Sequence, residues 1–380
     1  MREVRMVGAA YGRFGKRPGE AAAALAEEAL RALVDATEVD PQRIDAAYGG
    51  TTFGGSLMTQ RALQGIGVSG PPMVTVENAC ASGGSAVHLA WQAVASGAAD
   101  CVVALGAENL TDLGGGTLPL SSRDVEVGLG MVMPAAYAMR AQRYLADFDA
   151  PLDVLDLVSV KNRGNGALNH RAHFQQSVDV EEVRASRAIA DPLRLLHCCP
   201  NTDGAAAVLL TSEAVARDLP GPSVKVAASA IRSGTFHNGY RDMTWPDITA
   251  RTSKAAYEMA GLSPSDIDLV ELHDAFSISE LLHAEALGLA DRGAAHIRLA
   301  RGDFDRHGPL PINPSGGLLS RGHPVGATGV AQICEIYWQL TGQAGELQLP
   351  DPAVGLAHVT GGGIYGVDNG ACSVHILCAE

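Results

Sequence analysis

The segment at residues 75–97 reads TVENACASGGSAVHLAWQAVASG and changes from an extended pattern to a helical one at a cysteine. The pattern predicts a short strand over residues 74–76 and a helix over residues 81–95. Cys80 lies between the two. The first turn of the predicted helix holds only the small residues Ala-Ser-Gly-Gly. Residues of this size allow a second backbone, or a substrate, to approach closely.

A second segment of the same kind lies nearer the C-terminus. Residues 322–340 read GHPVGATGVAQICEIYWQL, which is again a Gly-rich turn that opens a helix. Each of the two helices is followed by a β-like run, CVVALG at residues 101–106 and AVGLAHVTGGG at residues 353–363. An order of turn, helix and strand that occurs twice indicates two similar α/β halves.

The segments upstream of these turns repeat as well. EVDPQRIDAAYGG at residues 38–50 and GLSPSDIDLVELHD at residues 261–274 share a proline, an Ile-Asp pair and a short run after it. Each follows a helical pattern, over residues 20–36 in the first case and 248–260 in the second. We therefore predict a duplication in which the two Gly-rich turns occupy equivalent places.

The segment between the halves has a different composition. Residues 112–200 include DLGGGTLPLSSRD and KNRGNGALNHRAHFQQ, which are polar, rich in Gly and Asn, and without a clear period. Such a segment is typical of a loop domain that covers a site, not of a core layer. The sequence thus predicts an N-terminal half over residues 1–111 and 201–220, the insertion, and a C-terminal half over residues 221–380.

Composition limits the class of protein. The chain has 380 residues, 47% hydrophobic and 18% charged, which is typical of a globular, soluble protein. The formal net charge of −14 argues against nucleic acid or an anionic membrane as a partner, and no apolar run is long enough to span a membrane. The seven cysteines lack the spacing of a disulfide framework, so we expect reduced thiols and a cytoplasmic location. A basic patch for an anionic ligand could comprise Lys161, Arg163, Arg171, Arg184, Arg187 and Arg194.

Cys80 is a candidate nucleophile, although a buried apolar role is the alternative. At a helix N-terminus, unpaired backbone N–H groups and the helix dipole favour the thiolate. A nucleophilic cysteine also needs a base and an oxyanion hole. His273 ends a strand-like run and is followed by Asp274, a candidate orienting partner, and His323 lies in the second Gly-rich turn. Because the duplication relates that turn to the one at Cys80, we expect the two turns to lie close together.

Four motifs, ENACASGG, HDAF, NPSGGLLSRGHPVGATG and HVTGGGIYG, resemble in order those of the thiolase superfamily. The HDAF form and the segment at residues 186–212 are similar to sterol-carrier-protein-type thiolases and their acetyl-CoA acetyltransferase-like bacterial and archaeal relatives. The resemblance implies an α/β fold of five α-β-α-β-α layers. Two duplicated βαβαβαββ halves, each with a five-stranded sheet, would build these layers, with a loop domain added.

The resemblance also implies an activity, a thiolase-type acyltransferase that makes or cleaves a carbon–carbon bond of a β-ketoacyl-CoA. Cys80 would take the acyl group as a thioester, and His323 would activate the thiol and help to hold the second substrate. His273 would help to form one oxyanion hole, and the N–H groups of Cys80 and Gly361 would form the other. A coenzyme A thioester would be the substrate, with no tightly bound cofactor. The relatives' assembly implies a homodimer or a dimer of dimers.

One departure from the family pattern affects the proton chemistry. Thiolases carry a second cysteine at one of two places, where this sequence has Val359 and Ala275. Three other cysteines are interpreted as packing residues: Cys334, Cys372 and Cys378. His273 or His323 would then move the proton, because an imidazole with a pKa near neutrality suits general-base work. The alternative is that the enzyme avoids this step by using a decarboxylating or already activated substrate.

Two other functions stay open. One is a thiolase-fold aldolase that acts on a β-hydroxyacyl-CoA with a tyrosine and a small OB-fold partner protein, and Tyr365 keeps this alternative open. The other is a non-catalytic acyl or lipid carrier, which would not need two histidines aligned with the nucleophile. Residues Tyr365, Arg163 and Met133 are candidate substrate contacts. No metal site is predicted, because the adjacent cysteines at 198–199 cannot easily close a tetrahedral site.

Overall fold

The computed structural model describes residues 2–235, 241–363 and 369–379. The first elements, with the strand that completes their sheet, are β1 (Val4–Tyr11), α1 (Ala22–Thr37), η1 (Pro41–Arg43), β2 (Ala46–Gly50), α2 (Met58–Gly65), β3 (Met73–Val76), α3 (Ser82–Ser96), β4 (Cys101–Glu108) and β7 (Gly204–Ser212). Between β4 and β7 lie η2 (Thr111–Leu113), α4 (Val125–Gly128), α5 (Met133–Asp147), α6 (Val154–Ala167), α7 (Val180–Ala185), β5 (Ala188–Ala190), β6 (Leu193–Arg194) and η3 (Leu195–His197). After β7 follow α8 (Glu213–Asp218), β8 (Val224–Ser233), α9 (Asp247–Ala260), η4 (Pro264–Asp266), β9 (Leu269–Glu271), α10 (Ser277–Ala286), α11 (Ala295–Ala300), α12 (Gly317–Ser320), α13 (Thr328–Leu340), η5 (Gly345–Leu347), β10 (Val354–Gly361) and β11 (Ala371–Cys378).

The strands form a nine-stranded sheet in the order β3-β2-β4-β7-β1-β8-β11-β10-β9. Its two halves join where β1 pairs with β8 through Arg5 with Lys225 and Met6 with Val224. The N-terminal half thus has the expected five strands, whereas the C-terminal half has four strands among the described residues. Ile312 makes an isolated parallel bridge to Val270 at the place of the missing strand. Prolines within residues 309–314 explain the difference, because proline cannot donate to a ladder.

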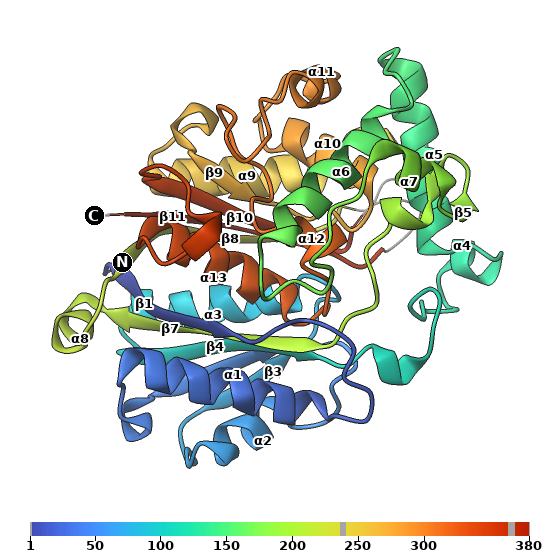
Figure 1. The fold of residues 1–380 in the computed structure, drawn as a ribbon. Helices are drawn as coiled ribbons and strands as arrows, with labels where there is room; N and C mark the ends of the chain where they lie inside the picture. The colour runs from blue at the N-terminus through green and yellow to red at the C-terminus, as the bar shows by residue number, and fades with distance from the viewer. Residues whose placement is uncertain (1, 236–240, 364–368, 380) are drawn as a thin grey trace.

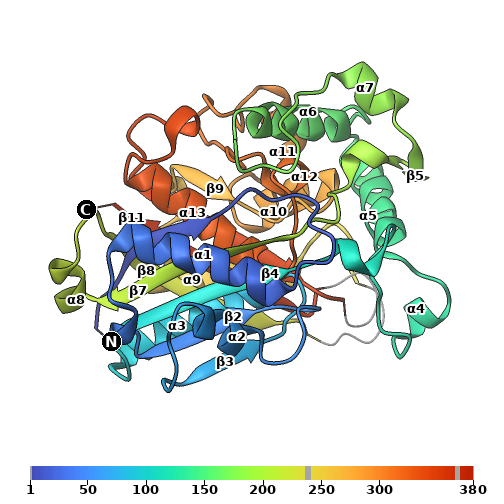
Figure 2. The same cartoon turned by 60° about the horizontal axis from the view of Figure 1, so that its bottom comes forward.

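Five layers alternate in Figure 1, as predicted. Helices α1 and α2 cover the outer face of the N-terminal strands, and α9 and α10 cover the outer face of the C-terminal strands. Helices α3 and α13 lie between the two sets of strands and contact each other. Figures 1 and 2 both show α4, α5 and α7 gathered beyond one end of the strands.

The two central helices meet through their glycines. A Cβ added to Gly83 would lie 2.5 Å from the carbonyl oxygen of Gly326, and one added to Gly329 would lie 2.5 Å from the nitrogen of Gly84. A side chain at either position would push the helices apart. The expectation that these small residues allow a close backbone approach is therefore confirmed. The predicted repeat is also visible upstream, where η1 and η4 begin at equivalent prolines.

The outer and central helices differ in burial because they occupy different layers. Helix α1 buries Leu25, Ala29, Leu30 and Leu33, the spacing of one helical face, and its other face is exposed. Helix α13 is buried almost all round, since it lies between two sheets. Among the described residues, none of the helices combines the length and the apolar character that crossing a membrane requires.

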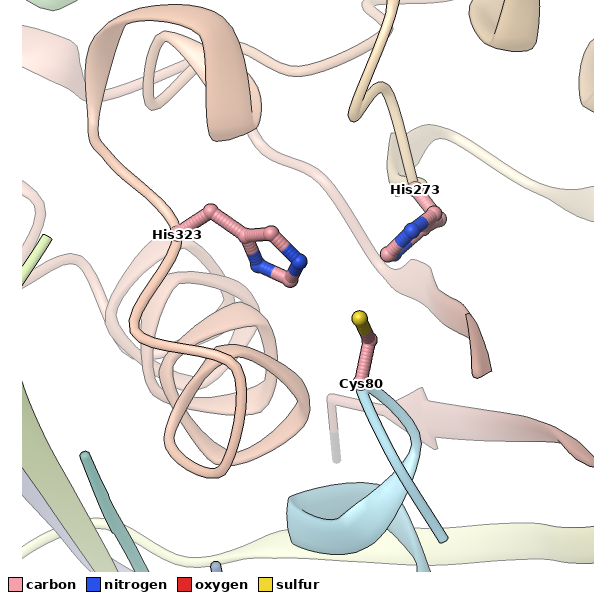
Figure 3. Close-up of side chains that lie close together, drawn as sticks. All are labelled: Cys80, His273 and His323. Carbon is pink, nitrogen blue, oxygen red and sulfur yellow. The ribbon is translucent and has the colours of Figure 1, made fainter. Parts of the chain in front are cut away.

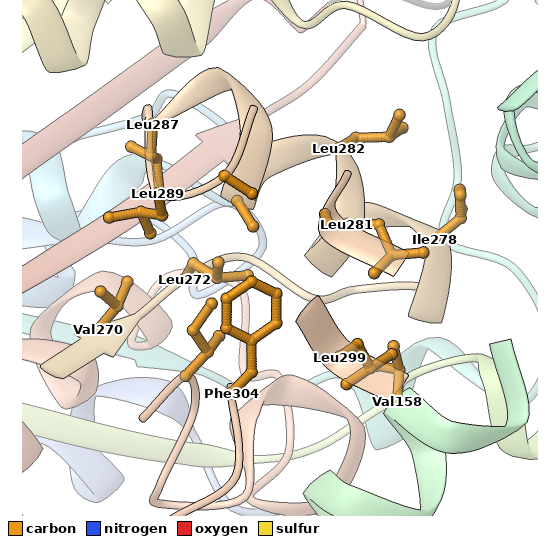
Figure 4. Packing of buried hydrophobic residues seen from close by; sticks show 14 of the residues in the cluster. Val158, Val270, Leu272, Ile278, Leu281, Leu282, Leu287, Leu289, Leu299 and Phe304 are labelled. Carbon is orange, nitrogen blue, oxygen red and sulfur yellow. The ribbon is translucent and has the colours of Figure 1, made fainter. Parts of the chain in front are cut away.

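The insertion is more ordered than its composition predicts. It forms α5 and α6, and Val158 of α6 packs in the same buried cluster as Leu272, Ile278 and Leu281 (Figure 4). The expectation of an aperiodic segment outside the core is therefore wrong. Helix α6 was not predicted from the sequence because its Asn and Gly residues have low helix propensity. The boundaries proposed for the three domains stay a prediction.

Candidate active site

Three side chains from distant parts of the chain meet at the ends of the strands. One ligating atom each of Cys80, His273 and His323 lies within 4.8 Å of the others. Figure 3 shows the cysteine sulfur pointing between the two imidazole rings, whose centroids are 5.2 Å apart. Cys80 lies between β3 and α3, His273 follows β9, and His323 precedes α13. The predicted proximity of the two Gly-rich turns is confirmed.

A tight turn presents Cys80 at this place. Ala79 has a φ of 48°, in the left-handed region that non-glycine residues rarely adopt. Its N–H donates to the carboxylate of Glu77 at 2.6 Å, and the N–H of Ala81 donates to the carbonyl of Asn78 at 3.0 Å. These bonds hold the reversal of the chain between β3 and α3.

The Cys80 thiol is not the stabilised thiolate that its helix position predicts. Burial, with a smaller contribution from the Glu108 carboxylate, raises the pKa of the thiol to about 12. These effects outweigh the N–H groups of Cys80 and Gly362, which lower it. Glu108 is fixed nearby because its carboxylate accepts from the N–H groups of Thr52 at 2.9 Å and Gly326 at 3.2 Å. The resting thiol is therefore neutral.

The hydrogen bonds around His323 show which ring nitrogen carries the free lone pair. The Thr328 hydroxyl donates to the carbonyl of Pro324 at 3.0 Å, and its oxygen lies 2.7 Å from Nδ1 of His323. Because a hydroxyl has one proton, its oxygen must accept from Nδ1–H. Nε2 is then an acceptor, and it is buried without a hydrogen-bond partner among the described residues. Burial lowers the pKa of this imidazole well below its usual value, so the ring is neutral and the lone pair of Nε2 is free.

His273 is also a neutral, buried imidazole with a free nitrogen. Burial lowers its pKa to about 3, and its Nδ1 has no hydrogen-bond partner in the described part of the chain. The expectation that Asp274 orients this ring is wrong. The Asp274 carboxylate accepts instead from Nδ2 of Asn162 and the N–H of Leu318, both at 2.7 Å. It ties α6 to the start of α12.

Gly361 provides room next to the nucleophile. A Cβ at this position would lie 2.6 Å from the nitrogen of Ala81 and 2.9 Å from that of Cys80. The amide that interacts with the Cys80 sulfur is that of the next residue, Gly362. Gly361 thus allows the close approach of β10, and its predicted part in an oxyanion hole stays a prediction.

A cavity of about 860 Å³ opens above the three side chains. Its wall includes Phe53, Met133, Tyr137, Phe174, Leu195 and Phe276. Met133 thus lines the cavity, and its contact with a substrate stays a prediction. Arg163 is placed behind the wall, with its guanidinium 4.2 Å from the ring centroid of Phe174. Tyr365 lies outside the described residues.

The cavity also contains thiols that sequence analysis considered only as metal ligands. Cys198 and Cys199 both line it, and the N–H of Cys199 donates to the carbonyl of Ala275 at 2.9 Å. Cys199 is therefore a neighbour of the position where a second cysteine was expected and is absent. The contact belongs to a β-bridge between Cys198 and Phe276, which are far apart in the sequence, so no local spacing predicts it.

The predicted basic patch does not form as one surface. Lys161 makes a buried ion pair with Glu280 at 3.0 Å, and Arg184 pairs with Asp156 at 2.8 Å. Arg187 does line the cavity. Most of the patch thus serves internal contacts.

A buried ion pair joins the two loops that carry the histidines. Nη1 of Arg321 lies 3.0 Å from the Glu271 carboxylate, and both side chains are 0% exposed. Ser315 adds its N–H at 3.0 Å and its hydroxyl at 2.8 Å to the same carboxylate. Glu271 lies two residues before His273 and Arg321 two before His323. Sequence analysis missed this pair.

We expect the rate at which iodoacetamide alkylates Cys80 to keep rising about tenfold per pH unit beyond pH ~9. The alkylation rate of an ordinary thiol reaches a plateau there. The reason is the raised pKa, since less thiolate is present at any given pH. The measurement is the rate of labelling of the Cys80 peptide by mass spectrometry, in a Cys198→Ala/Cys199→Ala background. A plateau below pH ~7 would instead indicate a thiolate–imidazolium pair and contradict the neutral resting state.

Comparison with known proteins identifies the family. The chain matches the thiolase N-terminal domain over residues 4–214 and the thiolase C-terminal domain-like family over residues 231–367. It belongs to the thiolase family, as the motifs predicted.

Its relatives include enzymes that transfer acyl groups. The chain is 39% identical over 386 residues to an acetyl-CoA acetyltransferase of Methanothermobacter thermautotrophicus, covering 99% of this chain and 100% of that protein. It is 36% identical over 385 residues to sterol carrier protein 2 of Homo sapiens, covering 95% and 70%. The solved structure of the Ltp2-ChsH2(DUF35) aldolase is similar at a TM-score of 0.86 and 28% identity, covering 99% of this chain and 98% of that one. The relatives support an acyltransferase enzyme with a thiolase fold.

Proposed function

We propose that the protein is a thiolase-type acyltransferase that makes or cleaves a carbon–carbon bond of a β-ketoacyl-CoA through an acyl-Cys80 intermediate. One observation carries the proposal. The sulfur of Cys80 lines a large cavity together with His273 and His323, and each imidazole has one buried nitrogen without a partner among the residues that the structure describes. Unpaired buried nitrogens are costly, which supports a ligand or a reacting group as their partner.

Acylation uses Cys80 and His323 as a neutral pair. The sulfur attacks the thioester carbonyl of the acyl-CoA while Nε2 of His323 takes the thiol proton. As the carbon–sulfur bond to coenzyme A breaks, the imidazolium returns this proton to the departing thiolate. Charge then develops only during attack, which agrees with the raised pKa of the thiol and the lowered pKa of the imidazole. Backbone N–H groups at Cys80 and at Gly361 or Gly362 would stabilise the oxyanion.

The second half of the reaction forms the carbon–carbon bond. A histidine removes a proton from the α-carbon of the second thioester, this carbon attacks the acyl carbonyl, and the bond to the Cys80 sulfur breaks. The histidine then returns the proton to the sulfur. We assign this step to His273, assisted by His323, because positions 275 and 359 offer no thiol. Met133 and Tyr365 are proposed substrate contacts, whereas Arg163, which lies behind Phe174 and does not line the cavity, is no longer proposed as one.

The proposal includes no tightly bound cofactor and no metal ion. Cys80, His273 and His323 have a spacing that could hold a metal. In the proposed mechanism, the Cys80 sulfur and the histidine nitrogens instead exchange protons with one another and interact with the substrate carbonyls. Insensitivity of turnover to a chelator is therefore part of the proposal.

A retro-aldol reaction on a β-hydroxyacyl-CoA is the second candidate function. The aldolase named above, which is solved with a DUF35 protein, favours it. A small OB-fold partner protein belongs to this alternative. A non-catalytic acyl or lipid carrier is the third candidate, and the aligned histidines count against it.

Three assays separate these functions. The purified chain is incubated with a β-ketoacyl-CoA and coenzyme A, with acetyl-CoA alone, and with a β-hydroxyacyl-CoA, and the products are identified by mass spectrometry. Thiolysis or condensation supports the acyltransferase. Release of an aldehyde or ketone from the third substrate alone supports the aldolase, and no product in any assay supports the carrier.

We expect a homodimer or a dimer of dimers at micromolar concentration. Strand β3 lies at one edge of the sheet, and Val74 on it is 44% exposed, so a second copy can pair with this edge. Analytical ultracentrifugation checks the assembly, and a monomer alone would contradict it.

We also propose a cytoplasmic location, which the seven free cysteines support.

A further inference from the structure

The strand that leads to His273 loses its backbone partners two residues before the active site. Strand β9 pairs with β10 up to Glu271 and Ala357. The next two N–H groups are taken by side chains. That of Leu272 donates to Oδ1 of Asn313 at 2.9 Å, and that of His273 donates to Nδ1 of His358 at 3.4 Å. Side-chain acceptors thus replace the hydrogen bonds between strands at the point where the chain turns toward the cavity.

His358 continues into a chain of buried groups on the outer face of the C-terminal sheet. Its Nε2 lies 3.1 Å from Oγ1 of Thr249 on α9, and this oxygen lies 3.1 Å from Nδ1 of His283 on α10. All three side chains are fully buried. The rings of His283 and His358 are 4.5 Å apart, and that of His273 is 6.4 Å from His283.

The backbone N–H of His273 fixes the direction of the two hydrogen bonds that His358 makes. A backbone N–H can only donate, so Nδ1 of His358 accepts, and the neutral ring carries its proton on Nε2. Nε2–H then donates to the oxygen of Thr249, whose own hydroxyl proton is available to Nδ1 of His283. Burial lowers the pKa of both rings well below the usual value, which keeps them in these neutral forms.

We propose that His358, oriented by Thr249 and His283, is a positioning residue that holds the backbone of His273 so that its imidazole faces Cys80. This inference rests on the proposed function, in which His273 acts after acylation. Without an acceptor at His358, the N–H of His273 loses its partner and the turn can shift. A misplacement of about 1 Å in a catalytic group is enough to slow a step on the order of 100-fold.

Substitutions at His358 test the acceptor. His358→Leu removes it, whereas His358→Asn keeps an oxygen near the place of Nδ1. His375→Leu is the matched control, because His375 is 1% exposed on the adjacent strand β11 and bonds to Ser229. We expect His358→Leu to acylate Cys80 at the wild-type rate and to slow the second step roughly 10- to 100-fold. His358→Asn should recover most of that loss, and the control should show none.

Substitutions at Thr249 test the orienting hydroxyl. Thr249→Val removes it with little change in shape, and Thr249→Ser retains it. Thr252→Val is the control on the same helix, since its hydroxyl bonds to the carbonyl of Ile248 at 2.6 Å and the side chain is fully buried. Thr249→Val should slow the second step several-fold more than Thr249→Ser or Thr252→Val. Equal rates for all three variants would overturn the role of Thr249.

The tautomer of His358 supplies a readout that does not depend on activity. In protein labelled with 15N-histidine, the signals lost in His358→Asn should show a neutral ring protonated on Nε2 near pH 7. A ring protonated on Nδ1 would overturn the inference. So would wild-type second-step rates in His358→Leu once acylation is established. Absence of acylation in the wild type would instead remove the proposed function and leave the tautomer prediction standing.

Discussion

His273→Ala is expected to leave acylation of Cys80 close to the wild-type rate and to slow the second step about 100-fold or more. In the proposed mechanism His323 is the base for the thiol, through its buried Nε2 that has no partner among the described residues, and His273 acts only in the second step. The measurement is a single-turnover experiment in which the acyl-enzyme is isolated and then mixed with the second substrate.

His323→Ala provides the contrast, because it should slow both acylation and the second step. His375→Ala, which removes a buried imidazole elsewhere in the same sheet, should slow neither. If His273→Ala turned over at the wild-type rate while Tyr365→Phe were inactive, the two-histidine mechanism would be wrong. A tyrosine-dependent aldolase would then be the better description.

Arg321→Met is expected to lower the free energy of unfolding by about 3–5 kcal/mol. The substitution leaves the Glu271 carboxylate fully buried without its cation. Burial raises the pKa of Glu271 to about 7 even with Arg321 beside it, so the charge depends strongly on this partner. Chemical denaturation at neutral pH measures the loss.

An exposed pair supplies the control for this prediction. Arg143 and Asp147 are paired at 2.7 Å on α5 with side chains 53% and 27% exposed, and Arg143→Met should cost less than about 1 kcal/mol. The double variant Arg321→Met/Glu271→Leu should regain part of the stability, because it removes both buried charges. Equal losses for Arg321→Met and Arg143→Met would show that the buried pair does not join the two loops.

The features predicted correctly are those that local sequence determines. Gly83 and Gly84 in the first turn indicated that a second backbone or a substrate could approach closely, and the backbone at Gly326 and Gly329 makes that approach. The repeated prolines of η1 and η4 marked equivalent places in the two halves. The proximity of Cys80 and His323 followed from this duplication, whereas the place of His273 was implied by the resemblance to the thiolase superfamily.

The features predicted wrongly depend on burial and on distant partners. The helix N-terminus at Cys80 was visible in the sequence, but the burial and the Glu108 carboxylate that raise its pKa were not. Asp274 was assigned to its neighbour in sequence, whereas its partners Asn162 and Leu318 come from α6 and α12. Helix α6 was not predicted because it is stabilised by hydrogen bonds of Asn162 and Asn165 to distant residues and not by intrinsic helix propensity.

The mass of the intact protein after incubation with acetyl-CoA tests the central claim most directly. The account predicts a gain of one acetyl group in the wild type, its loss in Cys80→Ala, and its retention in Cys198→Ala and Cys199→Ala, whose thiols line the same cavity. An adduct of unchanged mass and amount in Cys80→Ala would contradict the acyl-Cys80 intermediate.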